Sequence, residues 1–595
     1  MTLPRAEYPR PQFVRTDWLC LNGQWQFEID PGNSGLERGL LTHELNATII
    51  VPFCPESQLS GIGNTDFLNA VWYRRSVTVP AEWSGKRVRL HFQAVDYDAT
   101  VWINGQQVTR HRGGFTPFSV DVPDAVAGQS FTLVVRAQDT VEPSQPRGKQ
   151  SKRYGNYECV YTRTTGIWQT VWMEPLPDVA LERARITPDL ANSRFLITQP
   201  LAGARRVGLS LRASLRDAEG EVVSRTVKAD YDFAPQLDLP VPDGRRRLWS
   251  PADPFLYTLE LELLQGDTVL DHVSSYAGLR SVSIEGQAVK INGQTIFQRL
   301  VLDQGYYPDG IMTAPSDAAL VHDIELSMAA GFNGARLHQK VFEERFLYHA
   351  DRLGYLIWSE FPDWGCGGYG VVDDHQQPTP SYITQWLEAI ERDYAHPAII
   401  GWCPLNETWQ PLSDKITVLD DVTRAMFLAT KALDLSRPVL DTSGYAHRVA
   451  ETDVYDSHDY DQNPESFATR HAGLATGQPY LNLAHNREQS VPYRGQPYFV
   501  SEFGGIWWNP DARPDEDSWG YGERPHTIED VYARFSGLCN ILLDDPHMFG
   551  YCYTQLTDVY QEQNGIYTFD RRTKFDMQRI RAVQQRRAAI EDVTS

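Results

Sequence analysis

The sequence lacks the features that would tie it to a membrane or to an export route. Its 595 residues contain no apolar run of about 18 residues, the length that crosses a bilayer, so we expect no membrane partner. Residues 1–10 contain no apolar stretch typical of a secretory signal, which makes a cytoplasmic location the default expectation. The seven cysteines are far apart and include no Cys-x-x-Cys pair, so we expect free thiols.

Basic residues are also scarce relative to acidic ones. The chain has 55 Lys and Arg against 77 Asp and Glu, a formal net charge of −22. Affinity for a phosphate backbone comes mainly from clustered Lys and Arg, so we expect no nucleic-acid partner. The oligomeric state is left open, a homo-oligomer included.

Aromatic residues, by contrast, are abundant, with 16 Trp and 28 Tyr. Packing inside β-sandwich cores accounts for most of them, but aromatic faces also suit the C–H faces of sugars. The chain is longer than one hydrophobic core usually holds, so we expect several domains.

The first half of the chain alternates apolar and polar residues in short runs closed by turn residues, which is typical of antiparallel sheets. Asn104-Gly105, between two such runs, predicts a two-residue hairpin, because both turn positions need a positive φ. We interpret residues 1–180 as one β-sandwich. Alternation then resumes over residues 181–283, the size of an immunoglobulin-like sandwich.

After Gly286 short apolar runs alternate with helical stretches, which predicts a parallel sheet and, over residues 284–595, a (β/α)8 TIM barrel. Between the first two strands, Ser316 caps a predicted helix that buries Leu320, Ile324 and Met328 and ends at Gly331. Eight candidate strands follow in order: 297–302, 335–338, 356–360, 399–406, 439–442, 454–458, 498–502 and 549–555.

Two carboxylates end predicted barrel strands. Glu407 follows Asn406 at the end of the fourth strand, and Glu502 ends the seventh. Active sites of such barrels lie at the carboxyl ends of the strands, so the two groups are expected to face each other across the mouth. A retaining glycosidase needs such a pair, one ionised to attack the anomeric carbon and one protonated to release the leaving group. A single strand-end carboxylate is as often a helix cap or half of a salt bridge; two in one mouth favour catalysis.

Other polar or aromatic residues near strand ends are candidates for binding a carbohydrate substrate. Asn406 suits the sugar hydroxyl next to the anomeric carbon. Tyr553 is a candidate hydrogen-bond donor to the nucleophile, and Arg336 with Glu360 is best interpreted as a buried ion pair between strands. The remaining candidates are Arg299, Asp303, His338, His458, Asp459, Gln555 and the pocket-wall tryptophans Trp364, Trp402, Trp507 and Trp508. No His-x-His or His-Glu-x-x-His spacing occurs, so neither a metal nor another cofactor is predicted.

Motifs spread over nearly the whole chain resemble those of glycoside hydrolase family 2, which contains β-galactosidases, β-glucuronidases and β-mannosidases. The resemblance implies a jelly-roll sugar-binding-type domain, an immunoglobulin-like domain and a catalytic barrel, with Glu407 as acid/base and Glu502 as nucleophile. It rests on Trp102-Ile103-Asn104-Gly105, Thr165-Gly166-Ile167-Trp168-Gln169, Leu248-Trp249-Ser250-Pro251, His396-Pro397-Ala398-Ile399, Asn406-Glu407 and Ser501-Glu502-Phe503-Gly504.

Departures from that family's motifs bear on the substrate. The usual Arg-Gly-x-Asn-x-His after the first strand is replaced over residues 298–310, and the Asn-x-Lys of glucuronidases is replaced by Glu562-Gln563-Asn564. The strand-eight motif typical of mannosidases is also absent. We therefore expect a retaining exo-glycosidase of the β-D-galactosidase type, with β-D-galactofuranosidase and α-L-arabinofuranosidase as open alternatives. Glucuronides and mannosides are disfavoured. A non-catalytic carbohydrate-binding protein and a transglycosylase remain as rivals.

Overall fold

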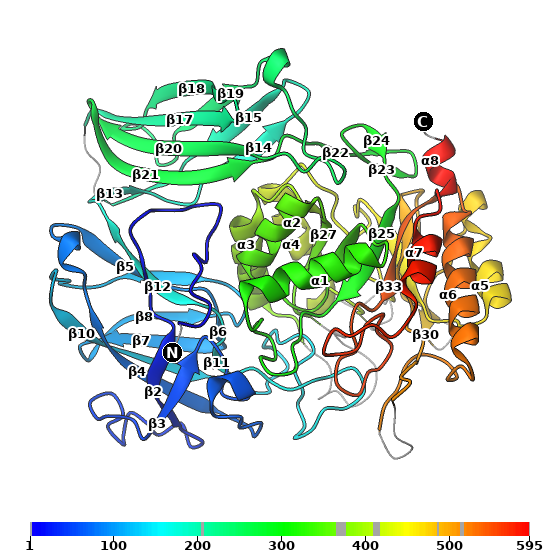
Figure 1. The fold of residues 1–595 in the computed structure, drawn as a ribbon, viewed down its shortest axis with the longest axis horizontal. Coiled ribbons are helices and arrows are strands. Elements are labelled where there is room, and N and C mark those ends of the chain that lie inside the picture. The colour runs from blue at the N-terminus through cyan, green and yellow to red at the C-terminus, as the bar shows by residue number, and fades with distance from the viewer. Residues whose placement is uncertain are drawn as a thin grey trace.

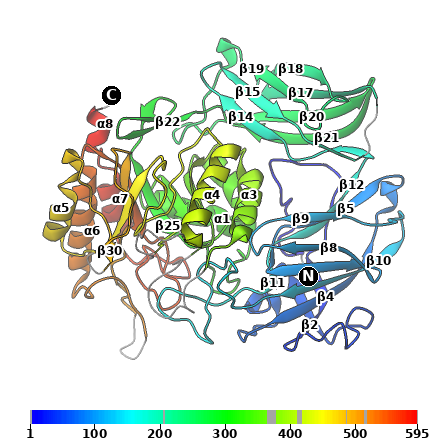
Figure 2. The same cartoon turned by 180° about the vertical axis from the view of Figure 1, so that it is seen from behind.

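The computed structural model describes residues 3–203, 207–363, 377–408, 417–484, 487–511 and 517–593. Two β-sandwiches and a barrel lie side by side, coloured blue to cyan, cyan to green, and green to red (Figure 1). The view from behind shows the barrel on the left and, on the right, the second sandwich above the first (Figure 2). None of the helices in these ranges combines the length and the apolar character that a membrane crossing requires.

The first sandwich packs two antiparallel sheets over one apolar core. Asn104 and Gly105, with φ of 50° and 83°, join the strands β7 (Asp98–Ile103) and β8 (Gln106–Arg112), which confirms the predicted hairpin. The larger sheet contains, in spatial order, β3 (Ala47–Val51), β2 (Gly23–Ile29), β4 (Ala70–Thr78), β10 (Ser130–Gln138), β7 (Asp98–Ile103) and β8 (Gln106–Arg112). The smaller contains β1 (Leu19–Cys20), β12 (Val171–Leu176), β5 (Arg87–Phe92) and β9 (Phe118–Asp121), and β6 (Val95–Asp96) pairs separately with β11 (Gly166–Ile167).

The second sandwich has its own apolar core. Its sheets are β18 (Gly220–Lys228), β17 (Leu209–Asp217), β20 (Tyr257–Gln265) and β21 (Thr268–Ala277), opposite β14 (Arg185–Asp189), β15 (Arg194–Thr198) and β19 (Gln236–Pro240), with β13 (Val179–Leu181) paired to β16 (Leu201–Gly203). A small sheet of β22 (Val282–Glu285), β23 (Ala288–Ile291) and β24 (Gln294–Thr295) then leads into the barrel.

The barrel is a curled parallel sheet, which confirms the predicted fold class. Its seven strands, in spatial order, are β28 (Ile399–Cys403), β27 (Leu356–Glu360), β26 (Gly334–Leu337), β25 (Gln298–Asp303), β33 (Met548–Thr554), β32 (Tyr498–Gly504) and β29 (Tyr455–Asp459). The predicted strand at 439–442 is present only as isolated parallel bridges from Val439 to Trp402 and from Ser443 to Asn406. That segment therefore lies alongside β28, next to the open edge of the sheet. A further short antiparallel pair is β30 (Leu483–Ala484) with β31 (Arg487–Glu488).

The helices of the barrel follow the strands as the alternating pattern predicts. Ser316 accepts the first-turn hydrogen bond from Ala319 in α1, as expected. Leu320 and Ile324 are buried, but the prediction for Met328 was wrong, because it is 37% exposed. The helices are α1 (Asp317–Ala329), α2 (Glu344–Leu353), α3 (Pro380–Asp393), α4 (Val418–Leu433), α5 (Pro464–His471), α6 (Ile528–Leu543), α7 (Met577–Gln584) and α8 (Ala589–Val593).

A long loop of the first domain lies against the barrel. Gly148 donates its backbone N–H to the carbonyl of Pro362, 2.9 Å away, just after β27. The backbone N–H of Tyr161 bonds to the carbonyl of Lys149 at 2.7 Å, which holds the two ends of this loop together. Gln304, after β25, donates to the Tyr161 hydroxyl at 2.9 Å. We call residues 148–161 the first-domain loop.

Candidate active site

Glu407 and Glu502 lie at neighbouring points of the barrel mouth. Both side chains are buried, and a carboxylate oxygen of each lies within 4.8 Å of the other. The backbone of Glu407 has φ of 51°, a left-handed conformation that non-glycine residues seldom adopt and that is enriched at functional sites. Its N–H bonds to the carbonyl of Ser443 at 2.8 Å, which fixes this turn.

Glu502 accepts hydrogen bonds at both of its oxygens. Arg336 donates from Nη1 to Oε1 over 3.3 Å, and Tyr460 donates from its hydroxyl to Oε2 over 2.5 Å. These two donors hold the carboxylate in one orientation, as a nucleophile requires. From the sequence we expected Tyr553, and not Tyr460, to donate this hydrogen bond. Tyr460 follows His458 by two positions, so the period of a strand could have placed both on the same face.

Arg336 is fully buried and links three groups of the site. It pairs with Glu360, as predicted, but it also contacts Glu502 and donates from Nη2 to Oδ1 of Asn406 at 2.9 Å. Although burial alone would raise it, Arg336 and His338 lower the pKa of Glu360 to about 2. The ion pair therefore does more than hold two strands in place, because Arg336 also orients the side chains of Glu502 and Asn406.

Asn406 has an amide nitrogen that faces the site without a partner among the described residues. Its oxygen is held by Arg336, which leaves Nδ2 as a donor beside Glu407. A buried donor of this kind is costly unless something fills the site. A sugar hydroxyl would supply the missing acceptor, in agreement with the role expected for Asn406.

His458 lies between the two glutamates. Its Nδ1 is 2.8 Å from Oε1 of Glu407 and 3.4 Å from Oε2 of Glu502, and its Nε2 is 3.0 Å from the hydroxyl of Ser443. Burial opposes a charge on this ring, but Glu502 and Glu407 together raise the pKa of His458. Among the described residues, these three are the group whose donor atoms come close enough to hold a cation. The hydrogen bond of His458 to Glu407 and its ion pair with Glu502 account for the short distances, so we assign no metal there.

The first-domain loop covers one side of the mouth. The hydroxyl of Tyr161 bonds to Glu562, and Gln304 bonds to Oε1 of Gln555 at 2.8 Å. Asn564 accepts from Nε2 of Gln555 at 2.8 Å, so the predicted residue Gln555 belongs to this wall. Sequence reasoning missed the loop, because no local pattern marks a contact between residues 400 positions apart.

Lys149 of the same loop is buried close to the acidic groups of the mouth. Although burial opposes it, the thiol of Cys159 and the carboxylates of Glu407 and Glu562 raise the pKa of Lys149. The loop therefore brings a cation into the barrel site.

Several predicted site residues point elsewhere. Arg299 begins β25 rather than ending it, and its guanidinium bonds to the carbonyls of Phe297 and Arg586, so the expectation of a substrate role is corrected. Asp303 is buried, and its carboxylate accepts a hydrogen bond from the backbone of Gly305. Its pKa is raised to about 7, by burial and by the nearby charge of Asp323.

The aromatic predictions require a similar correction. Tyr553 lies among Phe503 and Phe535 on the outer face of the sheet, and Trp402 bonds to Asp434 there at 2.8 Å. The side chains of Tyr553 and Trp402 therefore point away from the barrel mouth. Trp507 lies after β32 under the guanidinium of Arg524, at 5.2 Å from its carbon to the ring centre.

The remaining candidates have these positions. Asp459 pairs with Arg470 and His471 beside α5, next to a cavity of about 780 Å³ that also borders His458, Tyr460 and Tyr480. Trp508 packs against the barrel core, and Trp364 lies outside the described residues.

Two sandwiches joined to a barrel, with paired glutamates at its mouth, define the architecture of a glycoside hydrolase. Three family models match the chain: the galactose-binding domain-like part of glycosyl hydrolase 2 over 56–169, glycosyl hydrolases family 2 over 179–280, and its TIM barrel domain over 308–504. The chain belongs to glycosyl hydrolases family 2, which confirms the resemblance seen in its motifs.

Relatives with known names cover part of the chain. A β-glucuronidase from Paenibacillus borealis is 27% identical over 65% of this chain and 67% of its own length. A β-galactosidase from Thermoanaerobacter pseudethanolicus is 25% identical over 65% of this chain and 50% of its own length. A putative β-glucuronidase from Formosa agariphila is 28% identical over 66% of this chain, and the match spans only 46% of that protein. The matched region thus spans about half to two thirds of these proteins.

The fold itself extends over almost the whole chain. A solved β-glucuronidase from Ruminococcus gnavus, in complex with an N1-substituted uronic isofagomine, superposes with a TM-score of 0.78 at 19% identity. It covers 98% of this chain and 100% of the other. At this identity the likeness shows a shared fold.

Proposed function

We propose that the protein is a retaining exo-glycosidase in which Glu502 is the nucleophile and Glu407 the acid/base. One observation carries the proposal: the two carboxylates approach within 4.8 Å at the barrel mouth. Retaining glycosidases hold this pair about 5–5.5 Å apart, whereas inverting ones leave room for a water between them.

The reaction has two steps. Glu502, oriented by Arg336 and Tyr460, attacks the anomeric carbon while Glu407 gives its proton to the leaving oxygen. The C–O bond to the leaving group breaks, and a glycosyl ester forms on Glu502. Glu407 then takes a proton from water, which attacks the same carbon and frees Glu502. Asn406 Nδ2 supports both steps through the neighbouring sugar hydroxyl.

The first substrate candidate is a β-linked sugar of galactose configuration, including the related furanosides. Glu562 and Asn564 stand where the glucuronidase motif has Asn and Lys, and their side chains contact each other at 3.1 Å. A carboxylate at this position disfavours a uronic acid and suits a neutral sugar whose hydroxyls donate hydrogen bonds.

β-Glucuronides are the other candidate, and the names of the relatives support them better than galactosides. Lys149 supports them, because it brings a cation into a mouth that otherwise carries several carboxylates. Two of the relatives described above are also named for glucuronide activity.

The test combines a substrate panel with two variants. Nitrophenyl β-galactopyranoside, β-galactofuranoside, α-L-arabinofuranoside and β-glucuronide identify the sugar. On the best of these, Glu502→Ala should abolish turnover. Glu407→Ala should keep the first step on activated aryl glycosides and be rescued by azide, which gives a glycosyl azide of retained configuration. Wild-type turnover in Glu502→Ala would refute the proposal.

A further inference from the structure

The two ring nitrogens of His458 face different kinds of polar group. On one side, Nδ1 faces the carboxylates of Glu407 at 2.8 Å and Glu502 at 3.4 Å. On the other side, Nε2 faces the hydroxyl of Ser443 at 3.0 Å. The side chain of His458 is fully buried.

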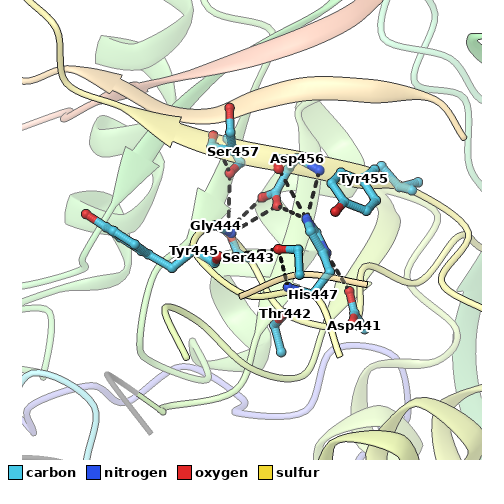
Figure 3. A network of polar contacts seen from close by, with 12 residues as sticks. Asp441, Thr442, Ser443, Gly444, Tyr445, His447, Tyr455, Asp456 and Ser457 are labelled. Carbon is cyan, nitrogen blue, oxygen red and sulfur yellow. Dashed lines mark hydrogen bonds and ion pairs between the residues drawn. The ribbon is translucent and has the colours of Figure 1, made fainter. Parts of the chain in front are cut away.

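The proton of the Ser443 hydroxyl is committed to Asp456. Ser443 donates to Oδ2 of Asp456 over 3.0 Å, and the other carboxylate oxygen accepts from the backbone of Gly444 at 2.9 Å. The hydroxyl of Ser501 also lies 3.2 Å from that of Ser443, but it donates to the carbonyl of Ser457 at 3.3 Å, and a neutral hydroxyl is a weaker acceptor than a carboxylate. Asp456 also faces Nε2 of His447 at 3.1 Å, and His447 is paired on its other side with Asp441 at 2.8 Å (Figure 3). Although burial opposes it, His447 lowers the pKa of Asp456, so this carboxylate is an ionised acceptor.

These contacts determine where the protons of His458 lie. Ser443 has one proton and gives it to an anion, so its oxygen can only accept from His458. Nε2 of His458 must therefore carry a hydrogen. Only Nδ1 is left to gain or lose a proton, and its nearest partner is Oε1 of Glu407.

We propose that Glu407 and His458 share the proton used for acid/base catalysis, and that Ser443 and Asp456 position His458 by fixing its Nε2–H tautomer. This rests on the proposed roles of Glu407 and Glu502. With one proton bound, it lies between Oε1 of Glu407 and Nδ1 of His458. Transfer to the leaving oxygen leaves Glu407 ionised and His458 neutral, with a lone pair at Nδ1. Removal of a proton from water in the second step restores the shared proton.

The backbone beneath the ring is adapted to this position. Gly444 has φ of 67°, and a Cβ there would meet the His458 ring at about 2.5 Å. The ring therefore packs directly on the peptide that also donates to Asp456. Besides the two glutamates, the charge of Arg336 and the ring of Tyr445 lie close to His458.

The experiment compares Ser443→Ala and Asp456→Asn with Ser457→Ala. Ser457 is also a buried hydroxyl, directly before His458, but it bonds to Tyr498 at 2.5 Å on the opposite face of the strand. It is therefore a control for the loss of a buried hydroxyl near the site. The substrates are phenyl and 2,4-dinitrophenyl glycosides of the sugar that the panel identifies, because kcat/KM then reports the first step alone.

We expect the two test variants to lose about 100-fold in kcat/KM on the phenyl glycoside, which needs a proton on its leaving oxygen, and less than about threefold on the dinitrophenyl glycoside, which does not. The alkaline limb of the phenyl profile should move to lower pH, because the shared proton is bound less tightly. A merely structural role would lower kcat/KM on both substrates equally. Equal losses on the two substrates, or an unmoved alkaline limb, would overturn the proposal.

A second measurement is independent of turnover. In protein labelled with 15N histidine, with His458→Asn used for assignment, we expect Nε2 of His458 to carry a proton across the pH range of stability. A neutral ring protonated only at Nδ1 would overturn the tautomer assignment. If no glycoside is hydrolysed but Nε2 is protonated, the proposed function fails while the arrangement of Ser443, Asp456 and His458 stands.

Discussion

The hydroxyl of Tyr460 donates a hydrogen bond of 2.5 Å to Oε2 of Glu502, and its ring stacks on that of Tyr521 with centres 3.4 Å apart. The phenol is thus held rigidly against the group that we propose as nucleophile. A hydrogen bond to a charged group contributes about 1.5–3 kcal/mol, so we expect Tyr460→Phe to lower kcat about 10- to 100-fold.

The control for this variant is Tyr553→Phe. Tyr553 is buried but lies outside the mouth, so loss of its hydroxyl should leave kcat within about twofold while any effect on the melting temperature matches a lost buried hydroxyl. If both variants lose activity to the same extent, the role of Tyr460 at Glu502 would be contradicted.

Substrate choice should respond to the pair Glu562 and Asn564. The double variant Glu562→Asn with Asn564→Lys recreates the Asn-x-Lys that the resemblance associates with glucuronidases. We expect the ratio of kcat/KM on β-glucuronide to that on β-galactoside to rise about 10-fold or more, because the new ammonium can pair with the sugar carboxylate.

The matched control for that change in charge is the double variant Glu562→Asn with Gln563→Lys, which alters the net charge equally but places the lysine one position earlier. Gln563 is the middle residue of the motif, and its side-chain oxygen accepts from Asn509 at 2.7 Å. An equal rise in the control would mean that net charge, and not a contact with the sugar, sets the preference.

The junction of the domains should be sensitive to Arg15. Its guanidinium pairs with Asp271 of the second sandwich at 2.8 Å and with Glu174 of the first at 3.0 Å, and all three side chains are buried. Arg15→Met would leave two carboxylates without this partner, a loss of about 3–5 kcal/mol by analogy with other buried pairs. Thermal unfolding of Arg15→Met should show a clearly lower transition temperature.

Arg38→Met is the comparison variant. The side chain of Arg38 is 44% exposed, and such exposed ion pairs contribute about 0–1 kcal/mol. Equal transitions for the two variants would contradict the prediction.

Stability should fall at alkaline pH through His447. Burial opposes a charge on this ring, but Asp441 raises the pKa of His447 well above its usual value near 6.5. A raised folded-state pKa means that the stabilisation is complete below about pH 6.5 and is lost as the pH rises through the folded pKa. We expect the melting temperature of His447→Gln to lie below that of the wild type at pH 6 and to approach it at alkaline pH. His322→Gln, on the exposed side of α1, should follow the wild type throughout. A difference in melting temperature between His447→Gln and the wild type that stays constant with pH would count against this account.

The fold was predictable where sequence periodicity decides structure. Buried parallel strands appear as apolar runs, and seven of the eight predicted strands are present. The remaining predicted strand, around Val439, does not form a continuous strand because its polar groups bond to side chains. The Asp441 N–H bonds to the hydroxyl of Thr452, and the Asp441 carboxylate accepts from the ring of His447 and the backbone of Arg448.

The site was predictable only in part, and for a related reason. The order of residues placed Glu407 and Glu502 at strand ends, but the face on which a side chain lies depends on where the strand begins. Arg299 was expected at the wrong end of its strand, and Tyr553 on the wrong face. The hydrogen bond between Tyr161 and Glu562 joins residues 401 positions apart, and no local signal announces it.

That contact has a consequence for how the protein can be divided. The first-domain loop supplies Lys149 and Tyr161 to a mouth that the barrel leaves open on that side. A barrel expressed alone would keep both glutamates yet present an unwalled cleft with altered charge. We therefore expect changes in this sandwich loop, which is remote from the barrel strands in sequence but adjacent in space, to alter the choice of substrate, and removal of the sandwich to remove that wall.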